Sequence, residues 1–226
     1  MQKPHNIPEI LAILENQYGR AEWFPRFSPI EELVQCILSQ HTSDTNSLRA
    51  FANLMQRYRT WQSVVDAPVK ELADTIRTGG LADSKAPRIQ AVLRQIKAEQ
   101  DDYNLDFLED MSDTEARKRL MALPGVGPKT AAIVLCFAMG RPVIPVDTHI
   151  FRVAWRLGLI EKRIGEAKAH DALQALVPPE LVFRFHVGLI THGRQICKAL
   201  NPRCGVCPLT AHCQAYQSAT EPSSGS

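Results

Sequence analysis

The chain has 226 residues, of which 45% are hydrophobic and 22% charged, ordinary values for a water-soluble globular protein of one large or two small domains. It holds no run of about 18 apolar residues, which excludes a membrane-spanning helix, and its first residues lack the apolar stretch of a secretory signal. We therefore expect a cytoplasmic protein with no membrane partner. The formal net charge of +2 permits a nucleic-acid partner only where basic residues cluster locally.

Almost every segment has the pattern of a helix, with apolar residues on a 3.6-residue period. These segments cover residues 7–19, 29–38, 69–80, 85–99, 113–123, 130–140 and 147–159. Ser28 and Pro29 form a typical helix start, Gly79 and Gly80 a typical helix end, and segment 130–140 is apolar all round, as in a buried central helix. No alternating strand pattern occurs, so the predicted fold class is all-α. Residues 216–226 have the composition of a disordered tail.

The stretch LPGVGPKTAA, residues 123–132, joins two predicted helices through a short glycine turn. It is not a nucleotide-binding P-loop, because Pro128 separates Gly127 from Lys129 and no glycine stands five positions before Gly127. The pattern is instead that of a helix-hairpin-helix. Gly125, Val126 and Gly127 would expose backbone N–H groups to a DNA phosphate, aided by the positive end of the next helix dipole. A plain turn between two packed helices explains the same spacing.

The six cysteines fall into two groups. Cys36 and Cys136 lie in apolar runs, which predicts buried thiols. The other four have the spacing C-x6-C-x2-C-x5-C; they are Cys197, Cys204, Cys207 and Cys213. In a reducing compartment this cluster indicates metal binding before disulfides, and the ligand pattern favours an iron–sulfur cluster over zinc. Lys198 and Arg203 lie between these cysteines and are candidates for a second phosphate contact.

Taken together, these features resemble the endonuclease III branch of the helix-hairpin-helix (HhH-GPD) DNA glycosylases. The matching stretches, in the family's order from about residue 29 to 213, are ILSQHTSD, GLADSKA, LPGVGPKTAAIVL, PVDTHIFRVAWRLGL and HGRQICKALNPRCGVCPLTAHC. The cysteine spacing is the most specific of them, since it is the family's [4Fe–4S] pattern. The resemblance implies two helical domains with a DNA cleft between them, residues 29–141 and residues 1–28 plus 142–215, followed by the tail.

The resemblance also implies a function in base-excision repair. A lysine at the position of Lys129 attacks C1′ of the damaged nucleoside, and an aspartate at the position of Asp147 assists. Relatives that only cleave the glycosidic bond lack this lysine, so Lys129 implies a bifunctional glycosylase and abasic-site lyase that forms a Schiff base and performs β-elimination. The expected partner is double-stranded DNA with damaged bases, chiefly oxidised pyrimidines, or abasic sites. We expect a monomer, associated with the nucleoid if bacterial.

Lys129 must be neutral to act as a nucleophile, whereas a free lysine at pH 7 is neutral only about once in 2,500. A helix N-terminus contributes roughly 0.3–1 kcal/mol, under one pKa unit, so the dipole alone is insufficient. We therefore expect Lys129 to be partly desolvated, in a pocket turned away from the phosphate. The competing interpretation is a surface lysine that contacts DNA. Asp147 is equally an ordinary N-cap of the helix that follows it, and His149 is expected to be structural.

An enzyme that acts on a base inside a duplex must extrude it and fill the gap. The resemblance places the filling side chains at Gln40 or His41 and at Leu81, and a pocket residue at Asp44. Each has an ordinary alternative, because Gln40 or His41 could be a polar residue at a helix end. Leu81 could be a turn residue anchored in the core, and Asp44 the first residue of the next helix.

Three positions depart from the pattern common in the family: Met121, Pro128 and Ala132. They bear on the range of lesions more than on the type of reaction. Two alternatives therefore stay open at this point. One is a glycosylase of another specificity, for mismatched thymine or uracil or for 8-oxoguanine. The other is a non-catalytic DNA-binding module with a zinc-stabilised loop.

Overall fold

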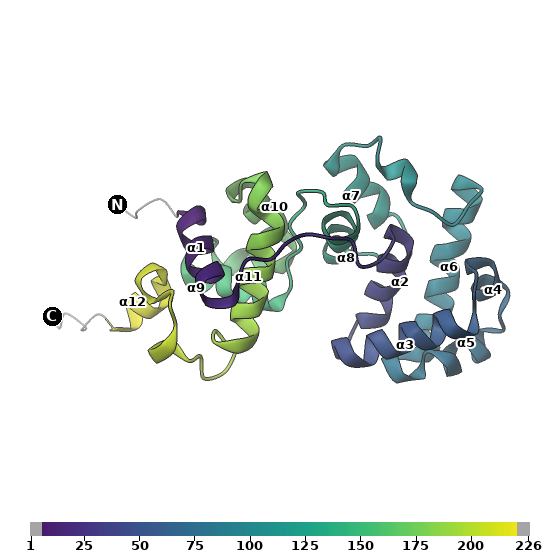
Figure 1. The fold of residues 1–226 in the computed structure, drawn as a ribbon, viewed down its shortest axis with the longest axis horizontal. Helices are drawn as coiled ribbons and strands as arrows, with labels where there is room; N and C mark the ends of the chain where they lie inside the picture. Colours follow the sequence, from purple (N-terminus) through teal and green to yellow (C-terminus); the bar gives the residue numbers. More distant parts are fainter. Residues whose placement is uncertain (1–5, 221–226) are drawn as a thin grey trace. The chain divides into compact units, whose positions relative to one another are not determined.

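The structure of the chain is a computed structural model that describes residues 6–220 (Figure 1). This part of the chain consists of helices joined by turns and irregular segments, and no strand occurs in it, which confirms the predicted all-α class. Within residues 6–220 no helix is both long and apolar enough to cross a membrane. The chain forms two compact units, one of residues 25–141 and one that joins the chain up to residue 24 to the chain from residue 142 onward. The sequence-based division placed the first boundary after residue 28.

The central unit, residues 25–141, is built around helix α2, most of whose residues are buried. Its helices are α2 (Pro29–Ser39), α3 (Asp44–Arg57), α4 (Trp61–Asp66), α5 (Val69–Thr75), α6 (Ala82–Gln100), α7 (Asp113–Met121) and α8 (Pro128–Ile133). Helix α2 packs against α3, α6 and α8, and Leu33, Val34 and Ile37 are buried there. Its start is the predicted one, since Ser28 is the N-cap directly before Pro29 and forms a capping box with Glu31.

Two predicted helices of this unit differ in extent from the observed ones. The helix predicted over 69–80 ends at Thr75 and continues as a 3₁₀ turn, Arg77–Gly79. A Cβ on Gly79 would lie 3.0 Å from the Cβ of Ala50, so the chain presses against α3 there and leaves the helical path. The buried helix predicted over 130–140 begins at Pro128 and passes into a π-helical turn, Val134–Ala138. Its burial is as predicted.

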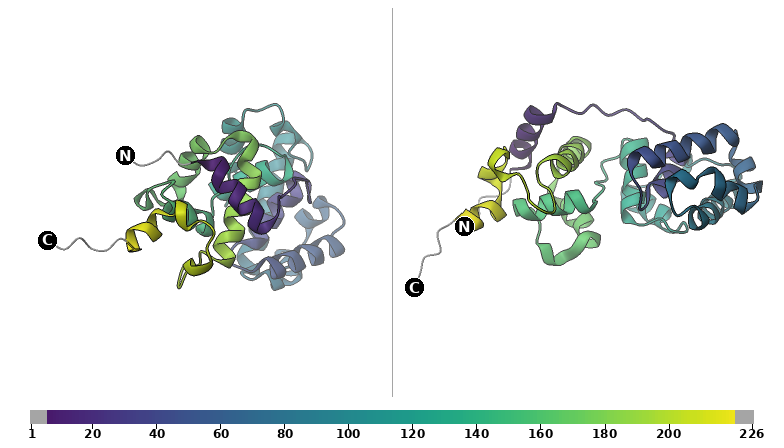
Figure 2. Two further views of the ribbon diagram at one scale, coloured as in Figure 1. Left: turned by 60° about the vertical axis from the view of Figure 1, so that its left-hand side comes forward. Right: turned by 90° about the horizontal axis from the view of Figure 1, so that it is seen from below.

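The other unit combines the N-terminal helix with the C-terminal ones. It contains α1 (Ile7–Tyr18), α9 (Thr148–Leu157), α10 (Gly165–Leu176), α11 (Val182–Gln195) and α12 (Gln214–Thr220). Helix α11 packs on both α1 and α9, and Figure 2 shows α1 among the C-terminal helices from two further sides. Arg184 of α11 donates two hydrogen bonds of 2.6 Å to the carboxylate of Glu15. The N-terminal helix is thereby fixed to the unit that holds the cysteine cluster.

The predicted disordered tail, residues 216–226, is wrong for its first part, because α12 extends to Thr220. The helix is held by tertiary contacts that composition does not report. It packs on α9, and Gln217 donates through Nε2 to the carbonyl of Ala211 at 2.8 Å. The rest of the predicted tail, from residue 221, lies outside the described residues.

Candidate functional site

The glycine turn lies between α7 and α8, as the sequence predicted. Gly125 has a φ of +72°, which favours glycine, and a Cβ there would lie 2.6 Å from Cδ of Arg88 and displace that side chain. Gly127 differs from the expectation. Its φ is −97° and its ψ 179°, an extended conformation open to any residue, and nothing would lie within 4 Å of a Cβ. The prediction of positive φ is therefore confirmed at Gly125 and wrong at Gly127, because Gly127 is the N-cap of α8.

The start of α8 carries no side-chain cap. Pro128 at its first position has no N–H group to satisfy. The N–H of Val126 donates to the carbonyl of Leu123 at 3.2 Å and its side chain is buried, so the turn itself engages this residue. Among residues 6–220, the N–H groups of Gly125 and Gly127 have no hydrogen-bond acceptor. These two N–H groups, rather than all three predicted, are open to an anion.

Lys129 is the second residue of α8, and its side chain is exposed. It forms no ion pair with any described residue. The partly desolvated pocket expected for it is therefore absent from the chain as described. The reason is local. Thr130, the next residue of α8, is buried, and Lys129 beside it faces solvent. The neighbouring Cys36 and Cys136 are buried thiols, as predicted.

Asp147 is the N-cap of α9 and is only 8% exposed. Its Oδ1 accepts a hydrogen bond of 2.8 Å from the N–H of Ile150, so the capping interpretation is confirmed. Its Oδ2 has no partner among the described residues, and one carboxylate oxygen therefore stays available. His149 is held in place by a contact of 3.0 Å between its Nδ1 and Nη2 of Arg152, which fits the structural role expected of it. Lys129 belongs to the central unit and Asp147 to the other.

The candidate residues for filling the base stack differ in the exposure of their side chains and in the hydrogen bonds that hold them. Gln40 is half-buried and tied on both sides, since its Oε1 accepts from Arg88 at 2.7 Å and its Nε2 lies 3.5 Å from the carbonyl of Gly125. His41 is exposed and has a φ of +54°. Leu81 is 58% exposed and has a φ of +51°, so the alternative of a core anchor is wrong. Left-handed backbone is uncommon for residues other than glycine and is rarer for leucine than for histidine; it also occurs here at Asp101 and Asn201.

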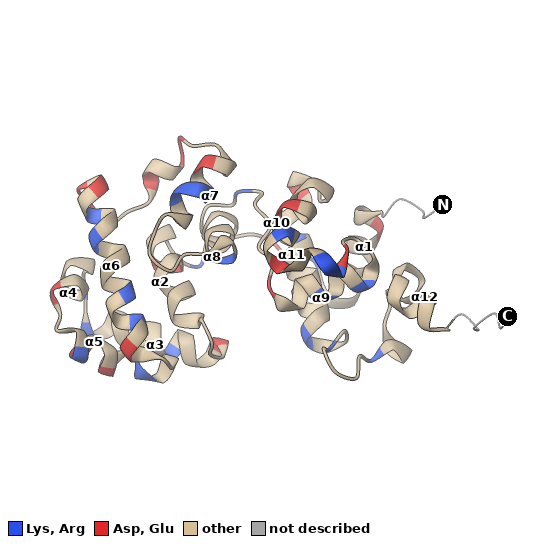
Figure 3. Ribbon diagram, turned by 180° about the vertical axis from the view of Figure 1, so that it is seen from behind, with Lys and Arg blue, Asp and Glu red and all other residues tan. Residues whose placement is uncertain are grey.

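Asp44 is exposed and is the first residue of α3, whose N-cap is Ser43. The ordinary interpretation, the start of the next helix, is thus confirmed, and it leaves the side chain at the surface. Lys198 and Arg203 are also exposed, in the loop that carries the cysteines. Figure 3 shows basic and acidic residues interspersed over both units. Any nucleic-acid contact would therefore be local, as the small net charge indicated.

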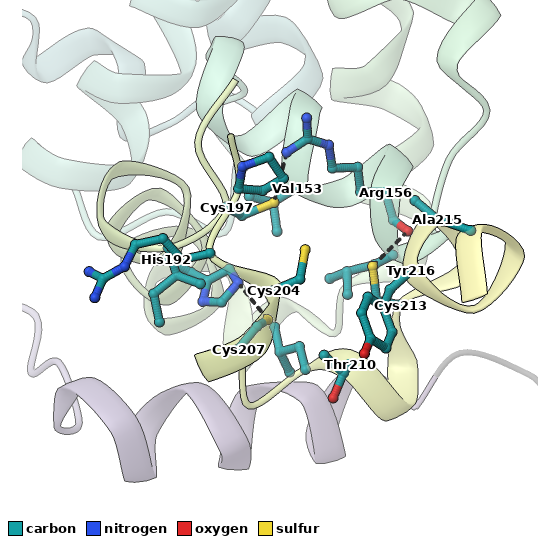
Figure 4. A pocket seen from close by; sticks show the side chains of 16 residues that line it. Val153, Arg156, His192, Cys197, Cys204, Cys207, Thr210, Cys213, Ala215 and Tyr216 are labelled. Atoms are coloured by element: carbon teal, nitrogen blue, oxygen red, sulfur yellow. Dashed lines mark hydrogen bonds between the residues drawn. The ribbon is translucent and has the colours of Figure 1, made fainter. Parts of the chain in front are cut away.

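The four clustered cysteines line one cavity of about 250 Å³, together with side chains of α9, α11 and α12. All four are free thiols, and Figure 4 shows their sulfur atoms arranged around the central space. Among the described residues, no three His, Cys, Asp or Glu side chains converge closely enough to ligate one ion. Sulfur atoms that surround a space suit a cluster of several metal ions better than a single zinc ion.

Comparisons with known proteins match both parts of this arrangement. Residues 34–179 match the family model of the HhH-GPD superfamily of base excision DNA repair proteins, and residues 197–213 match the iron–sulfur binding domain of endonuclease III. The endonuclease III of Thermotoga maritima is 36% identical over 198 residues, which cover 86% of this chain and 88% of that protein. The chain belongs to the endonuclease III family.

Two further comparisons bear on this endonuclease III family member. A relative from Arabidopsis thaliana is 38% identical over 170 residues, so this chain spans 58% of that protein's length. The solved structure of a trapped covalent intermediate between an endonuclease III and DNA has a TM-score of 0.80 and 30% identity, and covers 97% of this chain and 99% of that one. The family assignment makes the chain a DNA glycosylase and abasic-site lyase of base-excision repair that binds DNA. Its cofactor is the family's [4Fe–4S] cluster.

The structure adds residues around this cluster site that the sequence did not single out. Nη1 of Arg156 lies 3.3 Å from Sγ of Cys197, and Nε2 of His192 lies 3.5 Å from Sγ of Cys207. On its other side, His192 Nδ1 lies 2.9 Å from the hydroxyl of Tyr18. Burial lowers the pKa of His192 to about 4, so the ring is neutral and has a single N–H. A cysteine that ligates the cluster is a thiolate and can only accept, so with the cluster bound Nε2–H would donate to Cys207 and the Tyr18 hydroxyl would donate to Nδ1.

Proposed function

We propose that this endonuclease III family member is a monomeric bifunctional enzyme that removes oxidised pyrimidines from double-stranded DNA, with Lys129 as its nucleophile. The observation that carries the proposal is the position of Lys129 at the start of α8. It follows a turn whose two glycine N–H groups are open, and its amine is exposed and unpaired among the described residues. A phosphate held by Gly125 and Gly127 would bring the sugar of a neighbouring nucleotide to the amine.

The reaction follows from these groups. The neutral amine of Lys129 attacks C1′ as the bond from C1′ to the base breaks, and the base leaves with a proton. Loss of the amine proton and opening of the sugar ring give an imine. Removal of a proton from C2′ then expels the 3′ phosphate, and water hydrolyses the imine to release the lysine. The open Oδ2 of Asp147 is the proposed carboxylate that stabilises positive charge at C1′ and carries protons.

The exposure of Lys129 has a consequence for this chemistry. Since the chain as described does not desolvate the amine, the bound DNA must do so by excluding water from C1′. The nucleophile is therefore activated in the complex and not in the free enzyme.

The remaining candidates take supporting roles. His41 and Leu81 are proposed to fill the base stack, because both side chains are exposed on unusual backbone, whereas Gln40 is tied to Arg88. Asp44 is the proposed pocket residue, and Lys198 and Arg203 are proposed to make a second phosphate contact. The proposed cluster ligands are Cys197, Cys204, Cys207 and Cys213. The cluster's proposed contribution is to fold the loop that presents those basic side chains.

The positions that depart from the family pattern differ in exposure. Ala132 is fully buried in the central unit, so it affects packing and does not line an open pocket. Met121 is 39% exposed at the end of α7, beside the glycine turn. Of these two positions, Met121 is the better candidate to alter the lesion range.

Borohydride trapping on duplexes that contain thymine glycol or an abasic site tests the proposal. The wild type is expected to form a covalent adduct, and Lys129→Ala is expected to form none. Lys70→Ala is a matched control, because Lys70 is also the exposed second residue of an uncapped helix, α5, in the same unit. Absence of a wild-type adduct, or an equal adduct with Lys129→Ala, would refute the lyase mechanism.

A further inference from the structure

Lys85, in the first turns of α6, is buried to 1% exposure and is among the largest fully buried side chains of the protein. Its ammonium donates hydrogen bonds to two backbone carbonyls, of Leu38 at 2.6 Å and of Gly79 at 2.8 Å. No carboxylate among the described residues pairs with it. Burial, followed by the positive charge of Arg88, lowers the pKa of Lys85. An apolar side chain of similar length would avoid the cost of burying a charge but would leave both carbonyls without a donor, so the specific contribution of the ammonium is to join these two carbonyls.

The two carbonyls belong to two different turns. Leu38 lies in the last turn of α2, three residues before His41, and Gly79 lies two residues before Leu81. His41 and Leu81 are the exposed residues with left-handed backbone that the proposed function places in the base stack. Lys85 therefore joins the segment that presents one of them to the segment that presents the other.

Neither turn makes a comparable link by itself. The Leu81 carbonyl accepts from the N–H groups of Ser84 and Lys85 and from the Ser84 hydroxyl, all within the start of α6. The turn after α2 is closed by long local bonds, from Gln40 N–H to Ile37 and from Thr42 N–H to Ser39, both 3.4 Å. Each turn is thus ordered locally. The two turns are linked by the Lys85 ammonium, by the hydrogen bond of 2.7 Å from Arg88 of α6 to Gln40, and by packing of Gly79 near the Leu38 carbonyl, which would lie 3.7 Å from a Cβ at Gly79. Of these links, only Lys85 bonds directly to the backbone of both segments.

We propose that Lys85 is a positioning residue that fixes the separation of His41 and Leu81, so that both enter the duplex together when the lesion is extruded. This inference rests on the proposed function of those two residues. Two side chains that replace one base must arrive at a set spacing. A misplacement of about 1 Å in such a constellation can cost up to roughly a hundredfold in rate.

The test compares Lys85→Met with a matched control, Gln90→Met. Gln90 is also a fully buried α6 side chain that donates to two carbonyls, those of Val64 at 2.9 Å and Ala67 at 2.7 Å, away from the two turns. Each variant leaves two backbone carbonyls without their side-chain donor, and Gln90→Met also removes the hydrogen bond of 3.0 Å from Arg94 to Gln90 Oε1, so the control is at least as disruptive as Lys85→Met. Thermal melting and iron content establish that each variant is folded and loaded, and the conservative Lys85→Gln provides a second variant if Lys85→Met does not fold.

Single-turnover rates are then measured on a thymine-glycol duplex, where a base must be extruded, and on an abasic duplex, where none is present. On the thymine-glycol duplex we expect the single-turnover rate of Lys85→Met to fall by roughly tenfold or more. On the abasic duplex the fall should be smaller by a factor of several, and the rates of Gln90→Met should stay close to those of the wild type on both duplexes. In a double-mutant cycle with Leu81→Ala, the combined loss on thymine glycol should be smaller than the product of the single losses.

Three outcomes would overturn the inference: equal losses of Lys85→Met on both duplexes, the same losses in Gln90→Met, or losses that multiply in the cycle. In each case a wild-type adduct at Lys129 would leave the proposed function intact. If Leu81→Ala has no effect on thymine glycol, the base-filling role itself fails and the inference falls with it. The two failures are therefore distinguishable.

Discussion

The two proposed catalytic groups lie at the starts of helices α8 and α9, and the two helix starts are built in opposite ways. At α8 the N-cap is Gly127, no side chain caps the helix, and Lys129 is exposed. At α9 the N-cap is Asp147, its own carboxylate caps the helix, and the residue is buried. The start of α8 leaves its backbone N–H groups open to an external anion, whereas at the start of α9 the carboxylate of Asp147 accepts a hydrogen bond from the backbone.

This difference separates what the free protein prepares from what the substrate must supply. The capping bond fixes the orientation of Asp147 before DNA binds, and one oxygen remains for chemistry. Lys129 has neither a partner among the described residues nor burial to set its state. The proposed acid–base group is thus preorganised, whereas the proposed nucleophile would be completed by the complex.

Removal of the iron–sulfur cluster should produce the largest difference between the two helix starts, because it should destabilise the unit that contains α9 more than the unit that contains α8. Helix α9 is tied to the cysteine loop, because Arg152 donates to the carbonyls of Cys197 and Gly193, each at 2.9 Å. Structural metal sites contribute on the order of 10 kcal/mol to the folding of small metal-bound domains. We expect hydrogen exchange after chelation to show lost protection in α9 and α11 and retained protection in α2 and α6. Equal loss of protection in both units would contradict a stabilising effect of the cluster that is confined to its own unit.

Substitutions at Asp147 should separate its two roles. Asn is as good an N-cap as Asp, so Asp147→Asn should keep stability, whereas Asp147→Ala should cost about 1 kcal/mol in the free energy of unfolding. Both variants lack the carboxylate, and both should lose roughly 10²–10⁴-fold in single-turnover rate. Denaturant unfolding and glycosylase assays on the same samples provide the measurements. If Asp147→Asn retained wild-type activity, Asp147 would be a cap only.

Helix starts that depend on local chemistry were predictable from the sequence. The capping box of Ser28 and Glu31 and the cap at Asp147 involve residues three apart, and a pattern of that range determines them. The tail was not predictable in the same way, because the composition of residues 216–220 suggests disorder and only packing on α9 makes them helical. The prediction of a positive φ at Gly127 was wrong, because the backbone conformation there depends on where α8 begins and not on the residue type.

The candidate site was predictable where a motif carries it and not where the fold assembles it. The cysteine spacing identified the cofactor before any geometry was known, and the cysteines do line one cavity. Tyr18 had no signal at all, since it reaches His192 across 174 positions of sequence. Lys85 lay within a matched stretch, GLADSKA, but only the structure shows that its ammonium meets two turns. The requirement for a neutral amine did not predict the exposure of Lys129, because the sequence does not show what the bound substrate contributes.

The smallest expected effects come from closing the start of α8 with its own cap. Gly127 has ordinary backbone angles and open space around a Cβ, so Gly127→Ser and Gly127→Asp should both fold. Gly is already an acceptable N-cap, so Gly127→Ser should gain only a few tenths of a kcal/mol in stability. The serine hydroxyl would then occupy donors that we assign to phosphate and weaken DNA binding slightly.

Gly127→Asp sharpens this test, because it places a carboxylate where the phosphate would lie. We expect its affinity for an abasic duplex to fall by roughly tenfold and the slope of log K against log salt to decrease by about one phosphate contact. Titrations at several salt concentrations measure both quantities. Unchanged affinity would show that the open donors of α8 do not bind DNA, and Lys129 would then owe its position to other contacts. A loss in Gly127→Asp with no loss of stability would instead establish that α8 lacks a cap because DNA provides one.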